Sequence, residues 1–301
     1  MRLAGIVDSR VERADSVARE YGARAFGSVE QMISTFHEIE AASVAVPTSE
    51  HVRIGRILME AGVDVLIEKP LAATLEEVDE LMSLATGHGR VAQAGHVERF
   101  NPAVRATAQI ITQPMFFEVH RLSMFTPRSL DVDVVLDLMI HDLDVVLSFV
   151  NSPVSEIRAV GLPILSRKVD IANVRLEFES GCMANFTASR VSTEQVRKLR
   201  FFQPGQYISI DYGRQDVLVF TVGAEGTPSA NPDIRIAKPE VVSEEPLLAE
   251  IRSFLNAVRT RSRPVVSLED GRRALGLALE IVAAIQEHGK KVNLDEIRLR
   301  S

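Results

Sequence analysis

Val-Asp-Val-Leu-Ile-Glu-Lys-Pro, residues 63–70, is the clearest structural signal in this chain of 301 residues. An apolar run that ends in charged residues and a proline is typical of a strand buried on both faces of a parallel sheet. Similar runs stand at residues 3–7, 42–46 and 90–94. Segments with helical periodicity separate these runs, and helices are expected at residues 11–22, 29–36, 50–62 and from Thr74 onward. Strands that alternate with helices predict βαβ units and an α/β, Rossmann-type parallel sheet.

Several helix boundaries in this half have local signals. Gly22 and Gly62 stand where a left-handed residue ends a helix. Ser49 is a candidate N-cap for the helix that follows it. Thr74 with Glu77 forms the pattern of a capping box, in which each side chain accepts from the other residue's backbone N–H.

The second half has a different pattern. Residues 101–112 and 133–150 are expected to be helical, and residues 115–122 to form a strand. Five further runs alternate with period two and predict a mainly antiparallel sheet: 174–178, 183–188, 199–203, 207–212 and 217–222. Residues 224–245 are expected to be irregular, and two helices close the chain at 246–260 and 268–288. The prediction is a Rossmann-like domain over residues 1–100 and an α+β domain with an open, mainly antiparallel sheet over residues 101–301.

Composition narrows the function classes. Hydrophobic residues make up 46% and charged residues 25% of the chain, which is typical of a globular protein and excludes wholesale disorder. The net charge is 34 − 41 = −7 and no basic stripe is present, so no nucleic-acid partner is expected. The longest apolar runs are shorter than the ~20 residues of a membrane span. Cys182 is the single cysteine, which excludes an intramolecular disulfide and favours a reducing, cytoplasmic location.

Polar residues follow the predicted parallel strands. Ligands of open α/β sheets bind at the carboxyl ends of the strands. The residues at these ends are Asp8, Pro47, Thr48, Glu68, Lys69 and His96. The first half is therefore interpreted as a nucleotide-binding domain.

Asp137 and His141 are the most informative pair in the second half. Their spacing places them on one face of the expected helix, apart from the apolar stripe of Leu136, Ile140 and Leu143. A histidine titrates near ~6.5, and a neighbouring carboxylate can orient it for proton transfer. Two alternatives remain at this point: an exposed ion pair on a helix face, or two ligands of a metal. No third ligand is evident, so no metal is expected.

Three motifs carry a family resemblance. They are Glu-Lys-Pro at 68–70, Gly-His-Val-Glu-Arg-Phe-Asn-Pro at 95–102 and Asp-Leu-Met-Ile-His-Asp at 137–142. Pro47-Thr48 followed by His51 adds a fourth. In this order and spacing the chain resembles the Gfo/Idh/MocA oxidoreductases over its whole length, and most of all their nucleotide-sugar members.

The resemblance implies a role for each cofactor candidate. Asp8 would accept hydrogen bonds from the adenosine ribose hydroxyls, which favours NAD, whereas Arg10 could receive the 2′-phosphate of NADP. The other residues implied at the cofactor are Pro47, Thr48, His51, Glu68, Lys69 and His96. His51 could equally be a surface residue at the start of a helix.

The resemblance also implies the chemistry. Lys69 assists proton removal and positions the substrate, with Lys69–Pro70 expected as a cis peptide. His141 is the general base, and Asp137 orients it or accepts a hydrogen bond from the substrate. Arg99 and Asn101 offer donors to sugar hydroxyls or a diphosphate, unless Arg99 forms an ion pair in the linker. Lys69, Arg99, Asn101, Asp137 and His141 are thus the predicted substrate-binding residues.

The expected activity is oxidation of a ring hydroxyl of a sugar, C3 of a UDP-N-acetylhexosamine, with NAD or NADP. A dehydrogenase of free sugar or inositol is the alternative enzyme. Family members commonly pair through the open sheet, so a homodimer or homotetramer is expected.

One departure from the family is the absence of the Gly-x-Gly-x-x-Gly turn that holds a pyrophosphate. Met1 falls where the family's second strand begins, so the first strand and about 30 residues, one βαβ unit, are expected to be missing. Three interpretations remain: a start placed too far downstream, a trimmed chain, or a variant with weakened cofactor binding. A non-catalytic binding or regulatory protein is the functional alternative.

Overall fold

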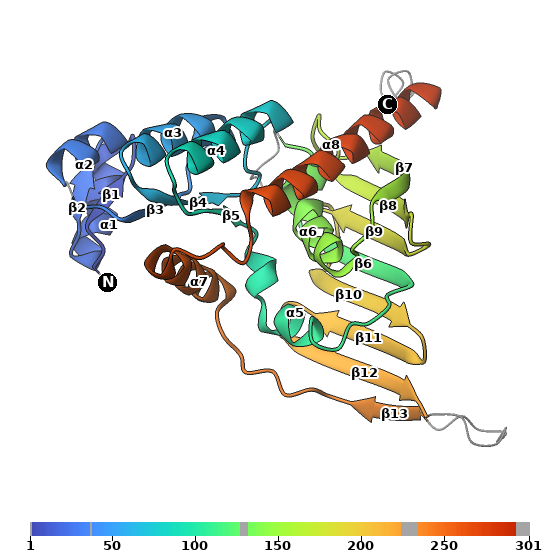
Figure 1. Cartoon of the computed structure of the whole chain (residues 1–301). Helices are drawn as coiled ribbons and strands as arrows, with labels where there is room; N and C mark the ends of the chain where they lie inside the picture. Colours follow the sequence, from blue (N-terminus) through green and yellow to red (C-terminus); the bar gives the residue numbers. More distant parts are fainter. Residues whose placement is uncertain (1, 37, 127–131, 224–233, 293–301) are drawn as a thin grey trace. The chain divides into compact units, whose positions relative to one another are not determined.

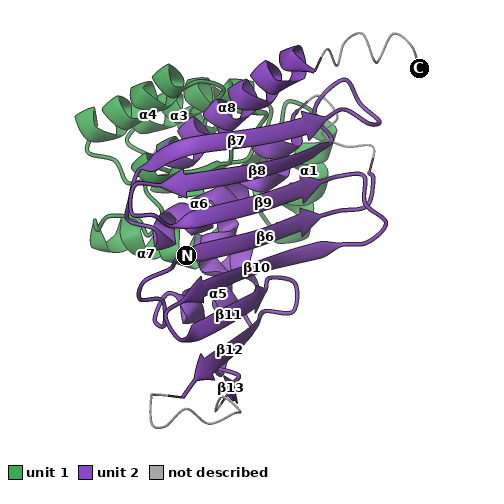
Figure 2. Cartoon of the chain, turned by 90° about the vertical axis from the view of Figure 1, so that its right-hand side faces the viewer, with its two compact units in different colours: residues 1–95, 251–272 green, residues 96–250, 273–301 purple. Residues whose placement is uncertain are grey.

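The computed structural model describes residues 2–36, 38–126, 132–223 and 234–292 (Figure 1). Contacts divide the chain into two units (Figure 2). Unit 1 comprises residues 1–95 and 251–272, and unit 2 comprises residues 96–250 and 273–301. No helix in the described part of the chain is long and apolar enough to cross a membrane.

The grouping of residues 251–272 with unit 1 differs from the expected boundary at residue 100. Its cause is an apolar cluster. Phe254, Ala257 and Val258 of helix α7 (Pro246–Thr260) pack with Leu66 and Val91 of the first half. The chain therefore returns to its first unit after the second sheet is complete.

Unit 1 contains parallel strands, as predicted. In its described residues, β1 (Gly5–Val7) pairs with β2 (Arg24–Phe26). A separate sheet has the order β3 (Ala41–Val44), β4 (Asp64–Glu68), β5 (Ala92–Gly95). β1 and β3 each have a strand partner on one side only within the described residues. The described strands of unit 1 thus form two separate parallel sheets.

Helices α1 (Val11–Tyr21), α2 (Val29–Thr35), α3 (His51–Glu60) and α4 (Leu75–Gly87) complete this half of unit 1. Three helix-end predictions are confirmed: Gly22 and Gly62 are left-handed at φ 65° and 83°, and Thr74 with Glu77 forms the capping box. The N-cap prediction for Ser49 is wrong. Residues Thr48–Glu50 form a 3₁₀ turn, and α3 starts after Glu50 without a side-chain cap.

Unit 2 is built on one sheet, whose described strands have the order β13-β12-β11-β10-β6-β9-β8-β7. Neighbouring strands are antiparallel except for the parallel pair β6–β9, so the mainly antiparallel prediction is confirmed. The bounds are β6 (Phe116–Leu122), β7 (Val154–Leu162), β8 (Ile171–Phe178), β9 (Met183–Ser189), β10 (Val196–Gln203), β11 (Gln206–Asp211), β12 (Asp216–Val222) and β13 (Ile234–Ala237).

The helices of unit 2 cover one face of this sheet (Figure 2). Alternate strand residues such as Phe117, Phe186 and Phe201 are fully buried and belong to one core with Ile140 and Leu143. The opposite face of the sheet is open in this chain. The helices are α5 (Pro102–Thr107), α6 (Ile140–Phe149), the first residues of α7 and most of α8 (Leu268–Lys291).

The expected straight helix over residues 133–150 is only partly correct. Residues Val135–Met139 form a π-helical turn, and the α-helix begins at Ile140. Single π turns within helices are frequent at functional sites. This one contains Asp137 and leads directly into His141.

Candidate active site

In unit 1, the carboxyl ends of β4 and β5 approach closely at Gly95. A Cβ at Gly95 would lie 2.9 Å from Glu68 Cα and 3.0 Å from Ile67 O, so only glycine fits without a shift of the backbone. Glu68 is partly buried, and burial raises the pKa of its carboxyl against the opposing effect of the Lys69 N–H and the Lys69 charge. The next peptide, Lys69–Pro70, is cis, as expected.

His51 links the segment that follows β4 to the segment that follows β3. Its ring is buried, with Nδ1 3.0 Å from Pro70 O and 3.1 Å from Leu71 O. Nε2 lies 3.0 Å from Val46 O. Because both ring nitrogens face backbone carbonyls, the imidazole holds the loops together and has no nitrogen directed to a ligand. The buried ring excludes the surface position considered for His51.

Asp8 follows β1 and is partly exposed. Its Oδ1 accepts a hydrogen bond from Arg10 N at 2.8 Å, and Oδ2 lies 3.4 Å from Arg13 Nε. Arg10 itself is largely exposed. At the end of β3, Pro47 precedes the 3₁₀ turn that contains Thr48. Asp8, Pro47 and Thr48 thus follow the carboxyl ends of β1 and β3.

The described residues fit the two ends of NAD(P). Asp8 would supply a carboxylate for the adenosine ribose, and at the other end Gly95 lets β5 pack against the backbone of Glu68, next to Lys69. The sequence supplies no Gly-rich pyrophosphate turn, and α1 follows Arg10 without a side-chain cap. The fit therefore rests on the strand ends and not on a phosphate loop.

In unit 2, Asp137 and His141 are four residues apart across the junction of the π turn and α6, and both are partly exposed. His96 is buried at the start of the segment that leads into α5. The candidate residues of unit 2 thus lie on two segments, 96–101 and 137–141.

Arg99 and Asn101 are held by other residues of the protein. Arg99 Nη1 lies 3.4 Å from the buried Asp144 Oδ1. Asn101 Oδ1 caps α5 by accepting from Ala103 N, and Nδ2 donates to Glu98 Oε2 and to Tyr212 O at 3.2 and 3.1 Å. The amide of Asn101 is thus a structural cap, and Arg99 forms the ion pair that sequence analysis left open.

A buried ionic cluster in unit 2 was missed by sequence reasoning. Arg121 on β6 bonds Asp142 and Glu98, which stand inside two of the family motifs. A signal was available, because Phe117, Val119 and Arg121 alternate onto the buried face of the predicted strand. A charge at such a position requires a buried partner.

Two further features bear on the chemistry. No group of three or more His, Cys, Asp or Glu side chains in the described ranges could hold a metal ion. Burial raises the pKa of the Cys182 thiol to about 11, which makes it a poor nucleophile.

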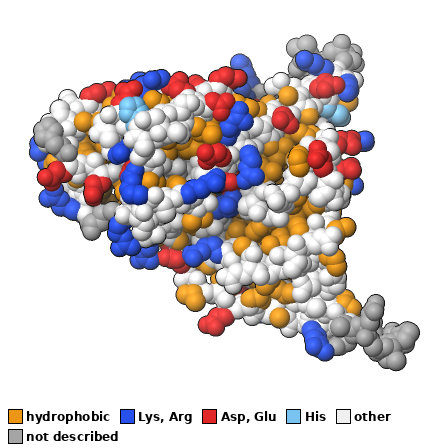
Figure 3. Space-filling model, in the orientation of Figure 1, with side chains coloured by type: hydrophobic (Ala, Val, Ile, Leu, Met, Phe, Trp, Pro, Cys, Tyr) orange, Lys and Arg blue, Asp and Glu red, His pale blue; other side chains and the backbone are white. Residues whose placement is uncertain are grey.

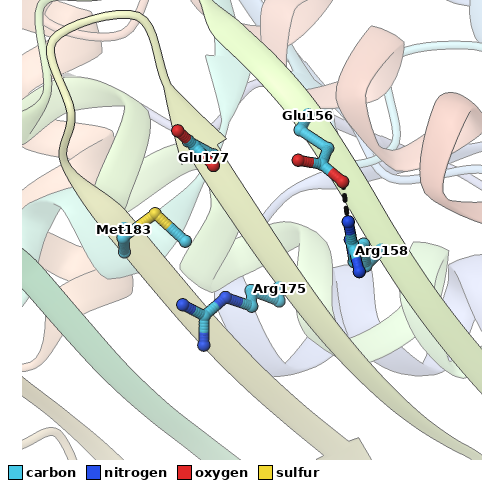
Figure 4. Close-up of a pocket in the computed structure, with 5 residues that line it drawn as sticks. All are labelled: Glu156, Arg158, Arg175, Glu177 and Met183. Carbon is cyan, nitrogen blue, oxygen red and sulfur yellow. Dashed lines mark hydrogen bonds and ion pairs between the residues drawn. The ribbon is translucent and has the colours of Figure 1, made fainter.

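The surface outside these segments carries mixed charge. On the face drawn in Figure 3, Lys and Arg side chains lie among Asp and Glu side chains. A shallow hollow on β7, β8 and β9 contains no candidate residue. It is lined by Glu156, Arg158, Arg175, Glu177 and Met183 (Figure 4).

Comparison with known proteins agrees with this arrangement. Residues 1–96 match the oxidoreductase family with an NAD-binding Rossmann fold, and residues 109–203 match the GFO/IDH/MocA C-terminal domain. UDP-N-acetylglucosamine 3-dehydrogenase of Acidithiobacillus ferrooxidans is 37% identical over 286 residues, 95% of this chain and 90% of that protein. A solved structure of that enzyme superimposes with a TM-score of 0.87 at 36% identity, covering 95% of this chain and 90% of that chain.

More distant relatives share the fold. The scyllo-inositol 2-dehydrogenase (NAD(+)) of Bacillus subtilis is 24% identical over 98% of this chain and 89% of its own length. Since both units are matched and one relative exceeds a third identity over nearly the whole chain, the chain belongs to the GFO/IDH/MocA family of NAD(P)-dependent oxidoreductases.

Proposed function

We propose that this chain oxidises the C3 hydroxyl of UDP-N-acetylglucosamine to a ketone with NAD(P)⁺. The observation that carries the proposal is the 37% identity to UDP-N-acetylglucosamine 3-dehydrogenase over 95% of the chain. Inositol dehydrogenases match at 23% and 24% identity over 98% of the chain, or at 26% and 29% over about half of it, so oxidation of free inositol is the less supported activity. Lys69, Asp137 and His141, the residues needed for proton removal, are all present.

Oxidation of a secondary alcohol removes a hydride from carbon and a proton from oxygen. NAD(P)⁺, when bound, supplies the hydride acceptor. His141 takes the hydroxyl proton onto a ring nitrogen, and Asp137 orients the imidazole or accepts a hydrogen bond from the substrate. The Lys69 ammonium donates a hydrogen bond to the reacting oxygen and lowers the cost of its developing negative charge.

A panel of substrates tests the proposal. Formation of NADH at 340 nm is measured with UDP-N-acetylglucosamine, with free N-acetylglucosamine and with myo-inositol, first with NAD⁺ and then with NADP⁺. Turnover that requires the UDP group is the expected result. Turnover of a free sugar or inositol at least as fast would establish the alternative dehydrogenase. A folded chain that turns over none of them would contradict the proposal and favour a non-catalytic binding or regulatory protein.

Asp8 selects NAD over NADP in this proposal. A carboxylate that accepts from ribose hydroxyls repels a 2′-phosphate, although Arg10 and Arg13 lie beside it. Asp8→Ala is expected to raise the Kd of NADH roughly 10-fold, because hydrogen bonds to charged groups contribute ~1.5–3 kcal/mol. Titration by nicotinamide fluorescence measures this, with Glu12→Ala on the exposed first turn of α1 as control. Tighter binding of NADPH than NADH to the unmodified chain contradicts the assignment.

The open face of the unit 2 sheet is proposed to bind a second copy of the chain. Phe202 stacks on Tyr207 with ring centroids 5.0 Å apart, and Tyr207 lies 5.2 Å from Phe220. Strand register extends these rings into a continuous apolar row across the face, formed by Ile236, Phe220, Tyr207, Phe202, Phe116 and Met183. Exposed apolar surface of this extent marks an association site.

A charge placed in this row is expected to dissociate the oligomer. Phe202 is 39% exposed, so the carboxylate of Phe202→Asp remains in water in the monomer. In the oligomer it would be buried, and the apolar contact of the phenyl ring would be lost. Light scattering after size exclusion is expected to show a dimer or tetramer for the unmodified chain and a monomer for the variant. Tyr21→Asp, at an exposed tyrosine of unit 1, is the control. A monomeric unmodified chain contradicts this proposal.

We also propose a cytoplasmic location, since the chain has a single cysteine.

A further inference from the structure

Arg121 lies at the centre of a buried ionic cluster in unit 2. Its Nε and Nη2 donate to the two oxygens of Asp142 at 2.6 and 3.0 Å, and its Nη1 donates to Glu98 Oε1 at 3.0 Å. The guanidinium carbon lies 5.1 Å from the centroid of the Tyr212 ring. Only the planar fork of an arginine can form this paired contact with one carboxylate while a third donor bonds another.

The cluster is costly to bury, so stability alone does not explain it. Burial raises the pKa of the Asp142 carboxyl, against the opposing charge of Arg121. Burial also disfavours the charge on Arg121, but Asp142 and Glu98 outweigh this effect and raise the guanidinium pKa. Buried ion pairs of this kind contribute little net stability compared with apolar residues, and their best-attested use is to fix one arrangement.

The arrangement fixed here involves both segments of the candidate site in unit 2. Asp142 follows His141 directly on α6, and Glu98 lies in the 3₁₀ turn Val97–Phe100 that follows His96. The ion pair between Arg99 and Asp144 ties the same two segments a second time. Arg121 therefore bonds both the helix of His141 and the turn after His96 from a third element, β6.

The π turn explains why α6 needs the contact between Arg121 and Asp142. Residues 135–139 close i→i+5 hydrogen bonds, such as Ile140 N to Val135 O, so the regular α-helical repeat is interrupted immediately before His141. The rotation of α6 about its axis is then not dictated by a continuous helix from residue 133. The paired bond from Arg121 to Asp142, one residue after His141, fixes that rotation.

We propose that Arg121 is a positioning residue for the dehydrogenase reaction, which holds α6 through Asp142 so that the imidazole of His141 keeps one direction relative to the 96–101 segment. The inference rests on the proposed function, in which His141 takes the proton. Arg121 itself does not contact the substrate in this role.

Arg121→Lys is the main test, because it keeps the charge and loses the fork. A displacement of the base by a fraction of an ångström to ~1 Å lowers kcat by roughly 10- to 100-fold. The KM for UDP-N-acetylglucosamine is expected to change less than 3-fold, and the pH profile of kcat to change shape. Arg272→Lys is the matched control, since Arg272 forms the same paired contact with Asp79, at 2.6 and 2.9 Å, on the exposed surface of unit 1. It is expected to leave kcat and its pH profile unchanged.

Asp142→Asn is the second variant, for the case that Arg121→Lys does not fold. It preserves the shape of the Asp142 side chain and weakens only its paired contact with Arg121. It is expected to lower kcat in the same way. In a His141→Ala background, Arg121→Lys is expected to cost less than 2-fold more, since the base it positions is absent.

The outcomes separate this inference from the proposed function. Full activity of His141→Ala would show that His141 is not the base. It would contradict both the proposed mechanism and the positioning role of Arg121, which depends on it. Loss of activity in His141→Ala with unchanged kcat and pH profile in folded Arg121→Lys or Asp142→Asn would overturn the positioning role alone. An equal further loss in the His141→Ala background would assign Arg121 a structural role only.

Discussion

His141→Ala is expected to lower kcat for UDP-N-acetylglucosamine by roughly 10²–10⁴-fold, the usual contribution of a general base. The structure places His141 on the second residue of α6, partly exposed, immediately after a π turn. Without the imidazole, water must accept the hydroxyl proton as the hydride leaves. Steady-state kinetics at saturating substrate and cofactor measure the loss.

Two controls define this result. His120→Ala changes a histidine of β6 that lies on the open face of the sheet, and it is expected to retain full turnover. The pH dependence of kcat that arises from deprotonation of the base is expected to disappear in His141→Ala. A variant at His141 that turns over at the unmodified rate, with the same pH dependence, excludes this residue as the base.

Lys69→Met is expected to lower kcat/KM by roughly 10²–10³-fold, the range found when one preorganised donor to a developing oxyanion is removed. Lys69 follows β4 beside the Gly95 cradle, where the main chain of β4 and β5 is closely packed. The methionine keeps the length of the side chain and removes only the ammonium.

Lys69→Arg and Lys198→Met complete the comparison. A guanidinium is larger, and its donors diverge, so Lys69→Arg is expected to recover little activity. Lys198 lies on β10 in the sheet of unit 2, and its removal is expected to leave kcat/KM unchanged. An unchanged kcat/KM in Lys69→Met, with correct folding by circular dichroism, contradicts the role proposed for Lys69.

Strong apolar periodicity made the fold predictable. The run at residues 63–67 appears as β4, and the run at 42–46 appears one or two residues earlier as β3. β2 was missed because three residues, Arg24–Phe26, are too few to show a period. β7 and β13 were also missed. β7 has a bulge between Val154 and Glu156 and is mostly exposed or half-buried, which obscures its period, and the four residues of β13 are exposed and lie in a stretch rich in turn-forming residues.

The sequence predicted where the candidate site residues stand along the chain, but not which groups their side chains contact. Sequence shows that His51 and Asn101 stand near strand ends, but it does not show which backbone group each side chain meets. The ring nitrogens of His51 lie 3.0–3.1 Å from three backbone carbonyls and Asn101 caps a helix, because a buried polar side chain must satisfy its hydrogen bonds locally. The π turn was also hidden, since one widened turn leaves the apolar spacing nearly unchanged.

Isotope transfer from C3 tests the central claim most directly. UDP-N-acetylglucosamine that carries deuterium at C3 is incubated with the enzyme and NAD⁺, and the reduced cofactor is analysed by mass spectrometry. The prediction is one deuterium in the reduced nicotinamide, with slower turnover than for the unlabelled sugar if hydride transfer limits the rate. Reduced cofactor without deuterium, together with a sugar that retains its label, would contradict oxidation at C3.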